Sequence, residues 1–316
     1  MKVLVTGGAG FIGSHVVDAL INKGDTVFVV DNLVTGTKQN VNAKAHFSNI
    51  DVCDQGIESI FQLGIDNVIH LAAQIDISTS IQNPLYDAKV NILGGLTILE
   101  NCKKYHVKKV IYANSAAEIG DLRYIPVDEQ HPLHPLSPYG VSKLTMHYYL
   151  QVYAQLYNLN FTTLRFANVY GPRQGNVGEG GVVSIFIQKL LHHEVPVIFG
   201  DGWQTRDFIY VGDVVDAIVL ALEKGSNTCY NVGTGKEISV HELFRLLCDL
   251  TGKEAAPKYQ EARKGEILRN VFSIEKIKKE LEWFPKITLR EGLQKTIASS
   301  QITPSKPHSS KIHFGK

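Results

Sequence analysis

The chain has 316 residues, of which 44% are hydrophobic and 20% charged, and its formal net charge is +1 at pH 7. This is the balance of an ordinary globular protein, and the length leaves room for two lobes. The near-neutral charge gives no indication of a nucleic-acid or membrane surface, and no apolar run reaches the roughly 18–20 residues that span a bilayer. Four widely spaced cysteines without a C-x-x-C pair favour reduced thiols in a cytoplasmic protein over a disulfide framework or a zinc site.

The first predicted element is the apolar strand Lys2–Thr6, which is followed at once by Gly7, Gly10 and Gly13, among which a helix begins. A strand with no polar face is typical of a central parallel strand covered on both sides. The glycines allow a tight turn and a close approach of the backbone to a pyrophosphate, and the helix N-terminus offers N–H groups to the phosphates. We therefore predict a dinucleotide site.

Asp31 closes the next predicted strand, residues 27–30, at the distance of about twenty residues that suits a hydrogen bond to a ribose 2′-hydroxyl. An acidic group there would repel a 2′-phosphate, so the expected cofactor is NAD rather than NADP. A glycine-rich turn in another kind of α/β protein is the alternative. The strand, the helix and the acid together favour the dinucleotide site.

Strand and helix patterns then alternate through the first half of the chain. Strands are expected over residues 67–73, 109–113 and 161–166, and helices from about 86 to 105, with Val90, Leu93, Leu96 and Leu99 on one face, and from about 139 to 156. This alternation predicts an α/β fold with a Rossmann-type, doubly wound parallel sheet. Because such sheets bind ligands at the carboxyl ends of their strands, the residues just after the strands matter most. They include Asp51, Ala72, Ala73, Ser115 and Asn168.

The second half has shorter predicted strands, and glycines cluster at 171–181 and 200–202. We therefore expect a cofactor domain over residues 1–167 and a smaller substrate-binding lobe mainly over residues 168–298, with some elements returning to the sheet. Residues 299–316 are rich in Ser, Lys, His and Pro and are expected to form a polar, flexible tail.

Tyr139 and Lys143 are four residues apart at the start of the second predicted helix, behind two prolines, and so project from one helical face. An ammonium group near the phenol lowers the tyrosine pKa from about 10, and the tyrosinate can then act as a general base toward a hydroxyl group. A surface Tyr and Lys on an amphipathic helix is the alternative. It is disfavoured by the dinucleotide site upstream.

A third catalytic group is expected at the end of the strand before this helix. Ser115 can hydrogen-bond a substrate oxygen that gains or loses a proton. A capping role for Ser115 is the alternative, and the neighbouring Asn114 could supply the polar group as well.

The chain resembles the extended short-chain dehydrogenases/reductases that act on nucleotide sugars, in the NAD-dependent epimerase/dehydratase family, and most of all the UDP-hexose 4-epimerase type. The resemblance reaches roughly to residue 295. It rests on Thr6–Gly13, Asp31–Leu33, His70–Ala73, Ser137–Lys143, Arg165–Arg173 and Arg206–Val211.

The resemblance implies a catalytic triad of Ser115, Tyr139 and Lys143, with Lys143 also holding the nicotinamide ribose. It implies further cofactor contacts from residues in four segments. These are Phe11 and Ile12; Asp31 and Asn32; Asp51 and Val52; and Leu71, Ala72, Ala73 and Gln74. It implies substrate contacts from Asn168, from Arg206 and Arg263 to the diphosphate, and from Glu266 near the uridine ribose. Arginine forks suit phosphate oxygens, although Arg206 could instead pair with Asp207 and Arg263 could lie in an ordinary charged loop.

The turn after Ser115 departs from the family pattern. Where the family usually has S-S-A-x-V-Y-G, this chain has Asn114–Gly120 with Glu118 and Ile119 at the Val and Tyr positions. Related 4,6-dehydratases carry an Asp-Glu pair directly after the triad hydroxyl, and here those positions are Ala116 and Ala117. Without that acid–base pair, epimerisation is the better expectation.

The expected function is thus NAD-dependent epimerisation at C4 of a UDP-hexose, such as UDP-glucose/UDP-galactose interconversion, through a transient 4-keto sugar, with tightly bound NAD. Alternatives are a UDP-N-acetylhexosamine or UDP-uronate epimerase, a decarboxylase or reductase of the same branch, and a non-catalytic NAD-binding regulator. The resemblance also implies a homodimer in which the helices from Tyr86 and Tyr139 pair across a two-fold axis. No histidine cluster has metal-site spacing, so no metal is expected.

Overall fold

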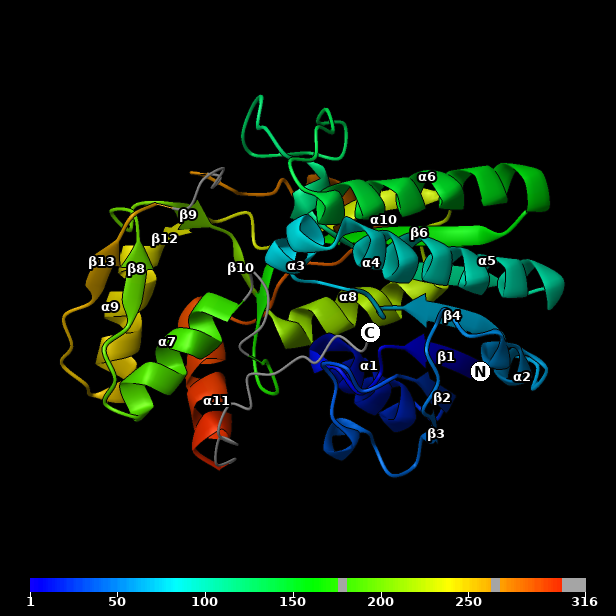
Figure 1. The fold of residues 1–316 in the computed structure, drawn as a ribbon, viewed down its shortest axis with the longest axis horizontal. Helices are drawn as coiled ribbons and strands as arrows, with labels where there is room; N and C mark the ends of the chain where they lie inside the picture. Colours follow the sequence, from blue (N-terminus) through cyan, green and yellow to red (C-terminus); the bar gives the residue numbers. More distant parts are fainter. Residues whose placement is uncertain (176–180, 263–267, 303–316) are drawn as a thin grey trace.

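The computed structural model describes residues 1–175, 181–262 and 268–302 of the chain. Within these residues a central sheet contains seven parallel strands in the order β11-β6-β5-β4-β1-β2-β3 (Figure 1). Their bounds are β1 (Lys2–Thr6), β2 (Thr26–Val30), β3 (His46–Ser48), β4 (Asn67–His70), β5 (Lys109–Ser115), β6 (Asn160–Phe166) and β11 (Thr228–Val232). The predicted Rossmann-type sheet is confirmed. Its order reverses beside β1, and doubly wound sheets bind ligands at such a switch point.

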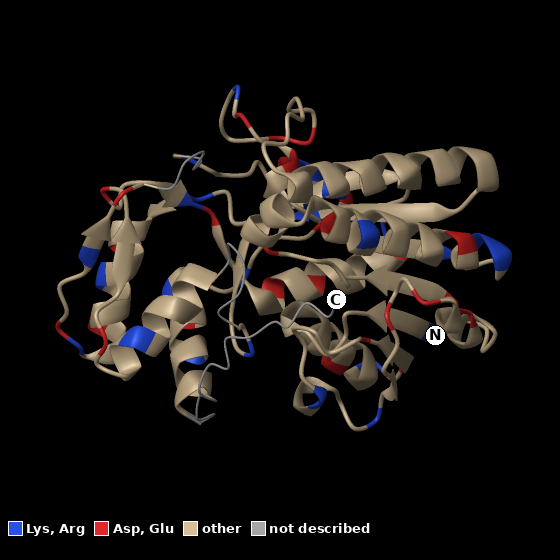
Figure 2. Ribbon diagram, viewed as in Figure 1, with Lys and Arg blue, Asp and Glu red and all other residues tan. Residues whose placement is uncertain are grey.

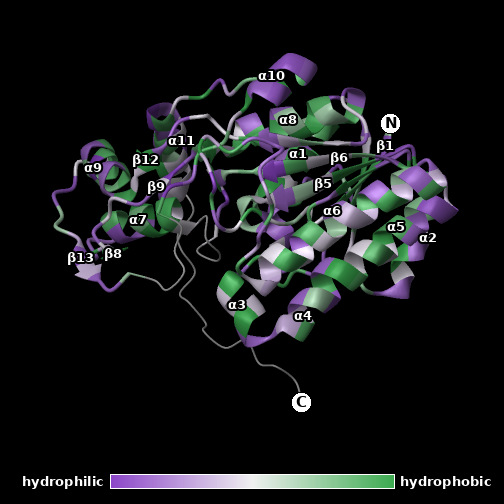
Figure 3. Ribbon diagram, turned by 90° about the horizontal axis from the view of Figure 1, so that it is seen from above, coloured by the Kyte–Doolittle hydropathy of each residue, from purple (hydrophilic) through white to green (hydrophobic). Residues whose placement is uncertain are grey.

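Helices cover both faces of the sheet (Figure 3). One face is covered by α1 (Phe11–Asn22), α8 (Val211–Glu223) and α10 (Glu275–Leu281), and the other by α2 (Glu58–Phe61), α5 (Gly94–Lys104) and α6 (Pro138–Tyr157). Val17 and Ile218 belong to the buried cluster of the first face, and Leu99 and Leu150 to that of the second. The apolar strands are therefore buried on both sides, as their sequences predict.

The helix expected over residues 86–105 is divided into three parts. It consists of α4 (Pro84–Ala88), the π-helical segment η3 (Lys89–Leu93) and α5. A π turn inserts extra residues into the helix and rotates the following residues about its axis. Leu93 is accordingly 57% exposed whereas Leu99 is buried, so the expectation of one continuous apolar face is wrong.

A smaller lobe packs beside the sheet domain (Figure 1). Its core lies among α7 (Val182–Leu191), α9 (Val240–Thr251) and α11 (Leu289–Ile302), with Phe186, Phe244 and Leu293 buried together. Three strand pairs complete it: β8 (Val197–Phe199) with β13 (Lys258–Gln260), β9 (Thr205–Arg206) with β12 (Ile238–Ser239), and β7 (Asn168–Tyr170) with β10 (Phe208–Tyr210). Because β11, α8 and α10 pack in the sheet domain, the second half of the chain contributes elements to both lobes.

The remaining short elements lie in connections of the sheet domain. They are η1 (Lys38–Asn40), η2 (Gln55–Ile57), α3 (Ile77–Gln82) and η4 (Ala116–Glu118). At the other end of the chain, α11 continues through residues 299–302, which we expected to begin the tail, and residues 303–316 lie outside the described part. In the described residues, none of the helices has the length and apolar character needed to cross a membrane.

Candidate active site

The loop between β1 and α1 requires glycine for steric reasons. Gly7 has φ +71°, and a Cβ atom there would lie 2.8 Å from the backbone nitrogen of Ala72. A Cβ atom on Gly13 would lie 2.1 Å from the carbonyl oxygen of Gly7. The loop is therefore closely packed against the strand ends. Gly10 is the N-cap of α1 and makes no side-chain cap, so the first-turn N–H groups at the positive end of the helix dipole receive no capping side chain.

Asp31 is attached to this loop directly. Its Oδ2 accepts a hydrogen bond from the backbone N–H of Ala9 at 3.0 Å, and its Oδ1 accepts one from Leu33 at 2.8 Å. A second acidic group lies nearby, because the Asn32 side chain donates to Asp51 at 2.8 Å. The narrow glycine loop, the open helix end and these carboxylates fit the diphosphate and the adenosine hydroxyls of NAD.

Asp51 is ionised in this setting. Burial by itself would raise the pKa of its carboxyl group, but hydrogen bonds from Cys53 and Asn32 outweigh burial and lower that pKa. The adjacent Val52 is buried, 5% exposed, against the sheet. Asp51 and Val52 thus offer one hydrogen-bond acceptor and one apolar surface at the predicted adenine position.

Residues Leu71–Gln74 follow β4 at the switch point. The Ala72 N–H donates to the hydroxyl of Thr6 at 3.2 Å, and the Gln74 N–H donates to Asn91 on the π-helical segment at 2.8 Å. Asn91 in turn donates to Ser142 of α6 at 3.1 Å and to the buried Asp87 at 3.0 Å. The predicted cofactor loop is thereby connected to the helix that carries Tyr139. Sequence reasoning missed Asp87, because a lone acid on an expected amphipathic helix resembles a solvated residue.

The helix α6 begins close to its predicted start near Tyr139, and the structure shows Ser137 as its N-cap and Pro138 in the first turn. The Ser137 hydroxyl accepts a hydrogen bond from the Gly140 N–H at 3.1 Å. Tyr139 and Lys143 lie one turn apart and are 8% and 5% exposed. Both are therefore removed from bulk water, which strengthens the electrostatic effect of one on the other.

The Lys143 ammonium group is held at the end of β5. Its Nζ donates a hydrogen bond to the carbonyl oxygen of Ala113 at 2.8 Å and lies 4.6 Å from the ring centroid of Tyr112. Burial lowers the pKa of Lys143 to about 8, although the charges of Glu118 and Asp87 act in the opposite direction. At neutral pH the group is still mostly protonated and can favour a neighbouring tyrosinate.

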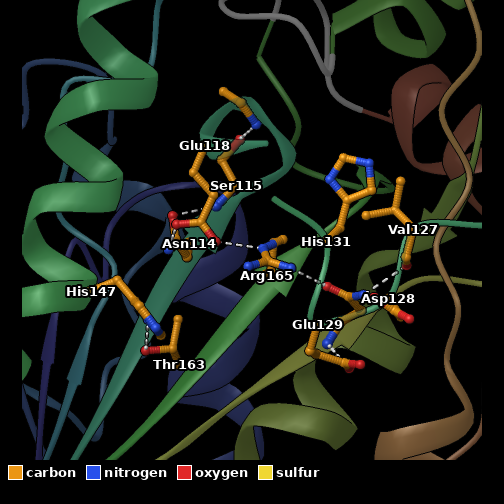
Figure 4. A network of polar contacts seen from close by, with 12 residues as sticks. Asn114, Ser115, Glu118, Val127, Asp128, Glu129, His131, His147, Thr163 and Arg165 are labelled. Carbon is orange, nitrogen blue, oxygen red and sulfur yellow. Dashed lines mark hydrogen bonds and ion pairs between the residues drawn. The ribbon is translucent and has the colours of Figure 1, made fainter. Parts of the chain in front are cut away.

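Ser115 is the last residue of β5, and its hydroxyl oxygen accepts a hydrogen bond from the Ala117 N–H at 3.2 Å. A hydroxyl that accepts in this way can still donate its own proton. The Asn114 side chain is directed elsewhere: it accepts from the Ser115 N–H at 2.8 Å and donates to the buried Glu118 (Figure 4). Of the two candidates for the third catalytic group, Ser115 is the more exposed.

The predicted substrate residues reach the same edge of the sheet from the small lobe. Asn168 begins β7, two residues after Phe166, which pairs with Ser115 across β5 and β6. Its N–H donates to the carbonyl oxygen of Asp207 at 2.9 Å, which places it beside the strand that carries Arg206. Arg206 donates to the carbonyl oxygen of Thr205 at 2.9 Å. Arg263 and Glu266 lie outside the described residues.

The sequence leaves open an ion pair between Arg206 and Asp207. The contacts of the Asp207 carboxylate are instead hydrogen bonds from the loop at Thr234 and Gly235. This carboxylate accepts hydrogen bonds from the N–H and hydroxyl groups of Thr234, at 2.8 and 2.6 Å, and from the Gly235 N–H at 3.1 Å. Burial raises the pKa of this carboxyl group, and the hydrogen bonds counteract that effect. Among the described residues there is no group of three or more His, Cys, Asp or Glu side chains that could hold a metal ion.

Residues 3–233 match the model of the NAD dependent epimerase/dehydratase family. A relative from Methanocaldococcus jannaschii, for which UDP-glucose 4-epimerase activity has been suggested, is 47% identical over 297 residues, 93% of this chain and 97% of its own. The solved structure of a UDP-glucose 4-epimerase from Thermotoga maritima with UDP-glucose is 45% identical with a TM-score of 0.94, covering 96% of this chain and 99% of its own.

A third similar protein is the Thermus thermophilus UDP-glucose 4-epimerase, solved in complex with NAD. It is 39% identical with a TM-score of 0.90, and the match covers 95% of this chain and 99% of that one. The chain belongs to the NAD-dependent epimerase/dehydratase family, and the resemblance that its motifs indicated is confirmed.

Proposed function

We propose that this enzyme interconverts UDP-glucose and UDP-galactose by epimerisation at C4, through a transient 4-keto sugar. The observation that carries the proposal is the arrangement of Tyr139 and Lys143 on one buried turn of α6, next to Ser115 at the end of β5. That group of residues lies at the carboxyl edge of a sheet whose first loop fits a dinucleotide. A general base beside a redox cofactor suits the reversible oxidation of a secondary alcohol.

In this mechanism Tyr139, as the tyrosinate, takes the proton of the C4 hydroxyl group, and the protonated Lys143 stabilises the tyrosinate. The Ser115 hydroxyl donates a hydrogen bond to the same sugar oxygen. Bound NAD supplies the chemistry of accepting hydride from C4 and returning it to the opposite face of the keto sugar. Tyr139 then gives the proton back to the C4 oxygen, so the active site ends in the state in which it began.

The nucleotide part of the substrate must hold the sugar while its keto form turns over. We assign this role to the small lobe, mainly residues 168–298, with residues 1–167 binding the cofactor. Asn168 and Arg206 lie beside the catalytic edge, and an arginine fork can bind two diphosphate oxygens at once. Arg263 and Glu266 are proposed for the second arginine contact and the uridine ribose on their sequence positions alone.

We propose further that NAD stays bound between turnovers, because the reaction cycle regenerates it. Protein purified without added NAD should then release about one equivalent of NAD per chain on denaturation, detected by chromatography. Protein that is free of NAD yet becomes active when NAD is added would contradict tight binding without contradicting the epimerase activity.

A homodimer is proposed from the surface of α4 and α6. In α6, which has 20 residues, the one charged residue is Lys143, and its side chain is buried, so the outer face of this helix carries no charge (Figure 2). Large apolar side chains are exposed on these two helices: Leu85, Val141, Tyr148, Val152 and Leu156. Exposed apolar side chains on two helices that pack together suit contact with a second copy of the same helices.

A cytoplasmic location is proposed as well, because all four cysteines are free thiols.

The test is incubation of the purified protein with UDP-galactose, with and without added NAD, followed by NMR detection of UDP-glucose. Parallel reactions with UDP-N-acetylgalactosamine and UDP-glucuronate measure the preferred sugar. Absence of UDP-glucose in both conditions would refute the proposal. Faster conversion of an N-acetylated or uronic sugar would keep C4 epimerisation and change the assigned substrate.

A further inference from the structure

Three polar side chains form a row across neighbouring strands near the catalytic edge. The strand register pairs Asn114 of β5 with Arg165 of β6, and Arg165 with Asn231 of β11. All three are buried, with exposures of 3%, 1% and 0%. The Arg165 guanidinium donates to the Asn231 side chain at 2.9 Å. Such a row inside a parallel sheet is costly unless every polar group finds a partner.

Glu118 completes the row from the η4 turn, three residues after Ser115. Its side chain is fully buried, and both carboxylate oxygens have partners: one forms an ion pair with the Nε of Arg165, and the other accepts a hydrogen bond from Asn114 (Figure 4). The charge is compensated locally by Arg165, which makes its burial tolerable.

These contacts lead directly to the catalytic serine. The side-chain oxygen of Asn114 accepts from the Ser115 N–H at 2.8 Å, while its amide nitrogen is held by Glu118. An asparagine amide fixed at one end presents its oxygen in one direction only. Glu118 therefore determines which way Asn114 faces, and Asn114 in turn fixes the backbone of Ser115.

The same turn also supports the catalytic helix. A Cβ atom on Gly140 would lie 2.4 Å from the carbonyl oxygen of Ala117, so the first turn of α6 packs directly on η4. A shift of the turn that contains Glu118 would therefore move Ser115 and the helix start that carries Tyr139 relative to each other. Geometry errors of about 1 Å at reacting groups can cost a hundredfold in rate.

We propose that Glu118 is a positioning residue for the reaction, acting through Asn114 on Ser115 and through η4 on the start of α6. The inference rests on the proposed epimerase function. Glu118 does not itself reach the substrate in this view, since its carboxylate is enclosed on both sides by Asn114 and Arg165.

Three variants test this role. Glu118→Gln keeps the shape of the side chain and removes its charge, and Asn114→Ala breaks the link to Ser115 while leaving the Glu118–Arg165 ion pair in place. The matched control is Glu129→Gln. Glu129 is a partly buried carboxylate at the far end of the row, where it accepts from the Asn231 N–H at 2.8 Å, and among the described residues it has no hydrogen bond to the Ser115 turn.

We expect kcat to fall at least tenfold in Glu118→Gln and in Asn114→Ala, with KM for the UDP-sugar and the amount of bound NAD within twofold of the parent. Glu129→Gln should keep kcat within twofold. Hydrogen exchange of the peptide spanning residues 113–119 should be faster in the first two variants and unchanged in the control. The Asn114→Ala arm decides the question if Glu118→Gln does not fold.

Values of kcat within twofold of the parent in both test variants would overturn the proposal, as would an equal loss of kcat in Glu129→Gln. A parent enzyme that is inactive on every UDP-sugar would refute the proposed function instead. In that case the hydrogen-exchange comparison still decides whether Glu118 orders the turn.

Discussion

The side-chain nitrogen of Lys143 donates a hydrogen bond to the carbonyl oxygen of Ala113 at 2.8 Å. This bond joins α6 to β5 two residues before Ser115, so one buried charge links the two elements that carry the proposed triad. Burial lowers the pKa of Lys143 to about 8, while the charges of Glu118 and Asp87 act against that shift. Because Lys143 shares a buried helical face with Tyr139, we expect its charge to serve catalysis.

Lys143→Met should therefore separate activity from stability. We expect kcat to fall about 10²- to 10⁴-fold, because the tyrosinate loses its neighbouring cation, while the melting temperature falls by only a few degrees, because one hydrogen bond to a carbonyl oxygen is lost. Lys109→Met is the matched control, since Lys109 is also buried but caps the carbonyl oxygens of Ala221 and Lys224 at 2.5 and 2.8 Å. The Lys109→Met variant should lose stability and keep the kcat of the parent. Steady-state kinetics and calorimetry measure both, and a Lys143→Met enzyme with normal kcat would contradict the mechanism.

Tyr139→Phe removes the proposed base without changing the shape of the helix. The expected result is a loss of about 10²- to 10⁴-fold in kcat with unchanged cofactor content. Tyr153→Phe serves as control on the same helix, because the Tyr153 hydroxyl donates to Glu100 away from the site. Near-normal turnover by Tyr139→Phe would rule out the tyrosinate as the base.

The sequence predicts the sheet and the long helix α6 because each depends on local patterns: apolar strands, glycine spacing, and the prolines before Tyr139. It does not predict the π-helical segment at Lys89–Leu93, which depends on tertiary contacts of Asn91 with Gln74 and Ser142. The sequence does not predict the burial of Glu118 either. Its partner Arg165 is 47 residues away in the chain, and the two meet because the register of β5 and β6 places Arg165 beside Asn114, just before the η4 turn that carries Glu118.

Gly140→Ala should be harmful although alanine is ordinarily the better helix former. The added Cβ atom would lie 2.4 Å from the carbonyl oxygen of Ala117, a backbone atom that cannot move without displacing the η4 turn. We expect a loss of about 1–3 kcal/mol in the free energy of unfolding, together with a lower kcat. At Gly56 the new Cβ atom would lie 3.4 Å from the Asp54 carboxylate, so Gly56→Ala should leave both quantities nearly unchanged. Equal effects of the two substitutions, measured by denaturation and kinetics, would refute the close-packing argument.

The dimer proposal predicts that a charge on the exposed face of α6 weakens association. Val152 and Leu156 are 43% and 65% exposed on this helix. Val152→Glu combined with Leu156→Glu places two like charges opposite their counterparts if the helices pair across a two-fold axis, and should yield monomers in sedimentation experiments. Leu268→Glu, at a 74% exposed position in the small lobe, should leave the dimer intact. A parent protein that sediments only as a monomer would contradict the proposal.

His70 should limit stability in acid. Its ring is buried at the end of β4, where its Nδ1 lies 2.7 Å from the Thr6 hydroxyl and the ring stacks on Tyr112. Burial, assisted by the charge of Lys143, lowers the pKa of His70 from 6.5 to about 3. Between these values the unfolded chain binds a proton that the folded protein does not, so stability falls as the pH decreases from about 6.5 toward 3. At about 1.4 kcal/mol per pKa unit the effect is of the order of 5 kcal/mol.

The measurement is the free energy of unfolding at a series of pH values. His70→Asn should lower stability at neutral pH, because it leaves a smaller side chain in the core, but should flatten the decline between pH 6.5 and 3. His106→Asn is the control: His106 is exposed with φ +54°, a conformation that asparagine tolerates, and its pH dependence should match that of the parent. If His70→Asn keeps the full acid slope of the parent, protonation of His70 is not the cause of the decline.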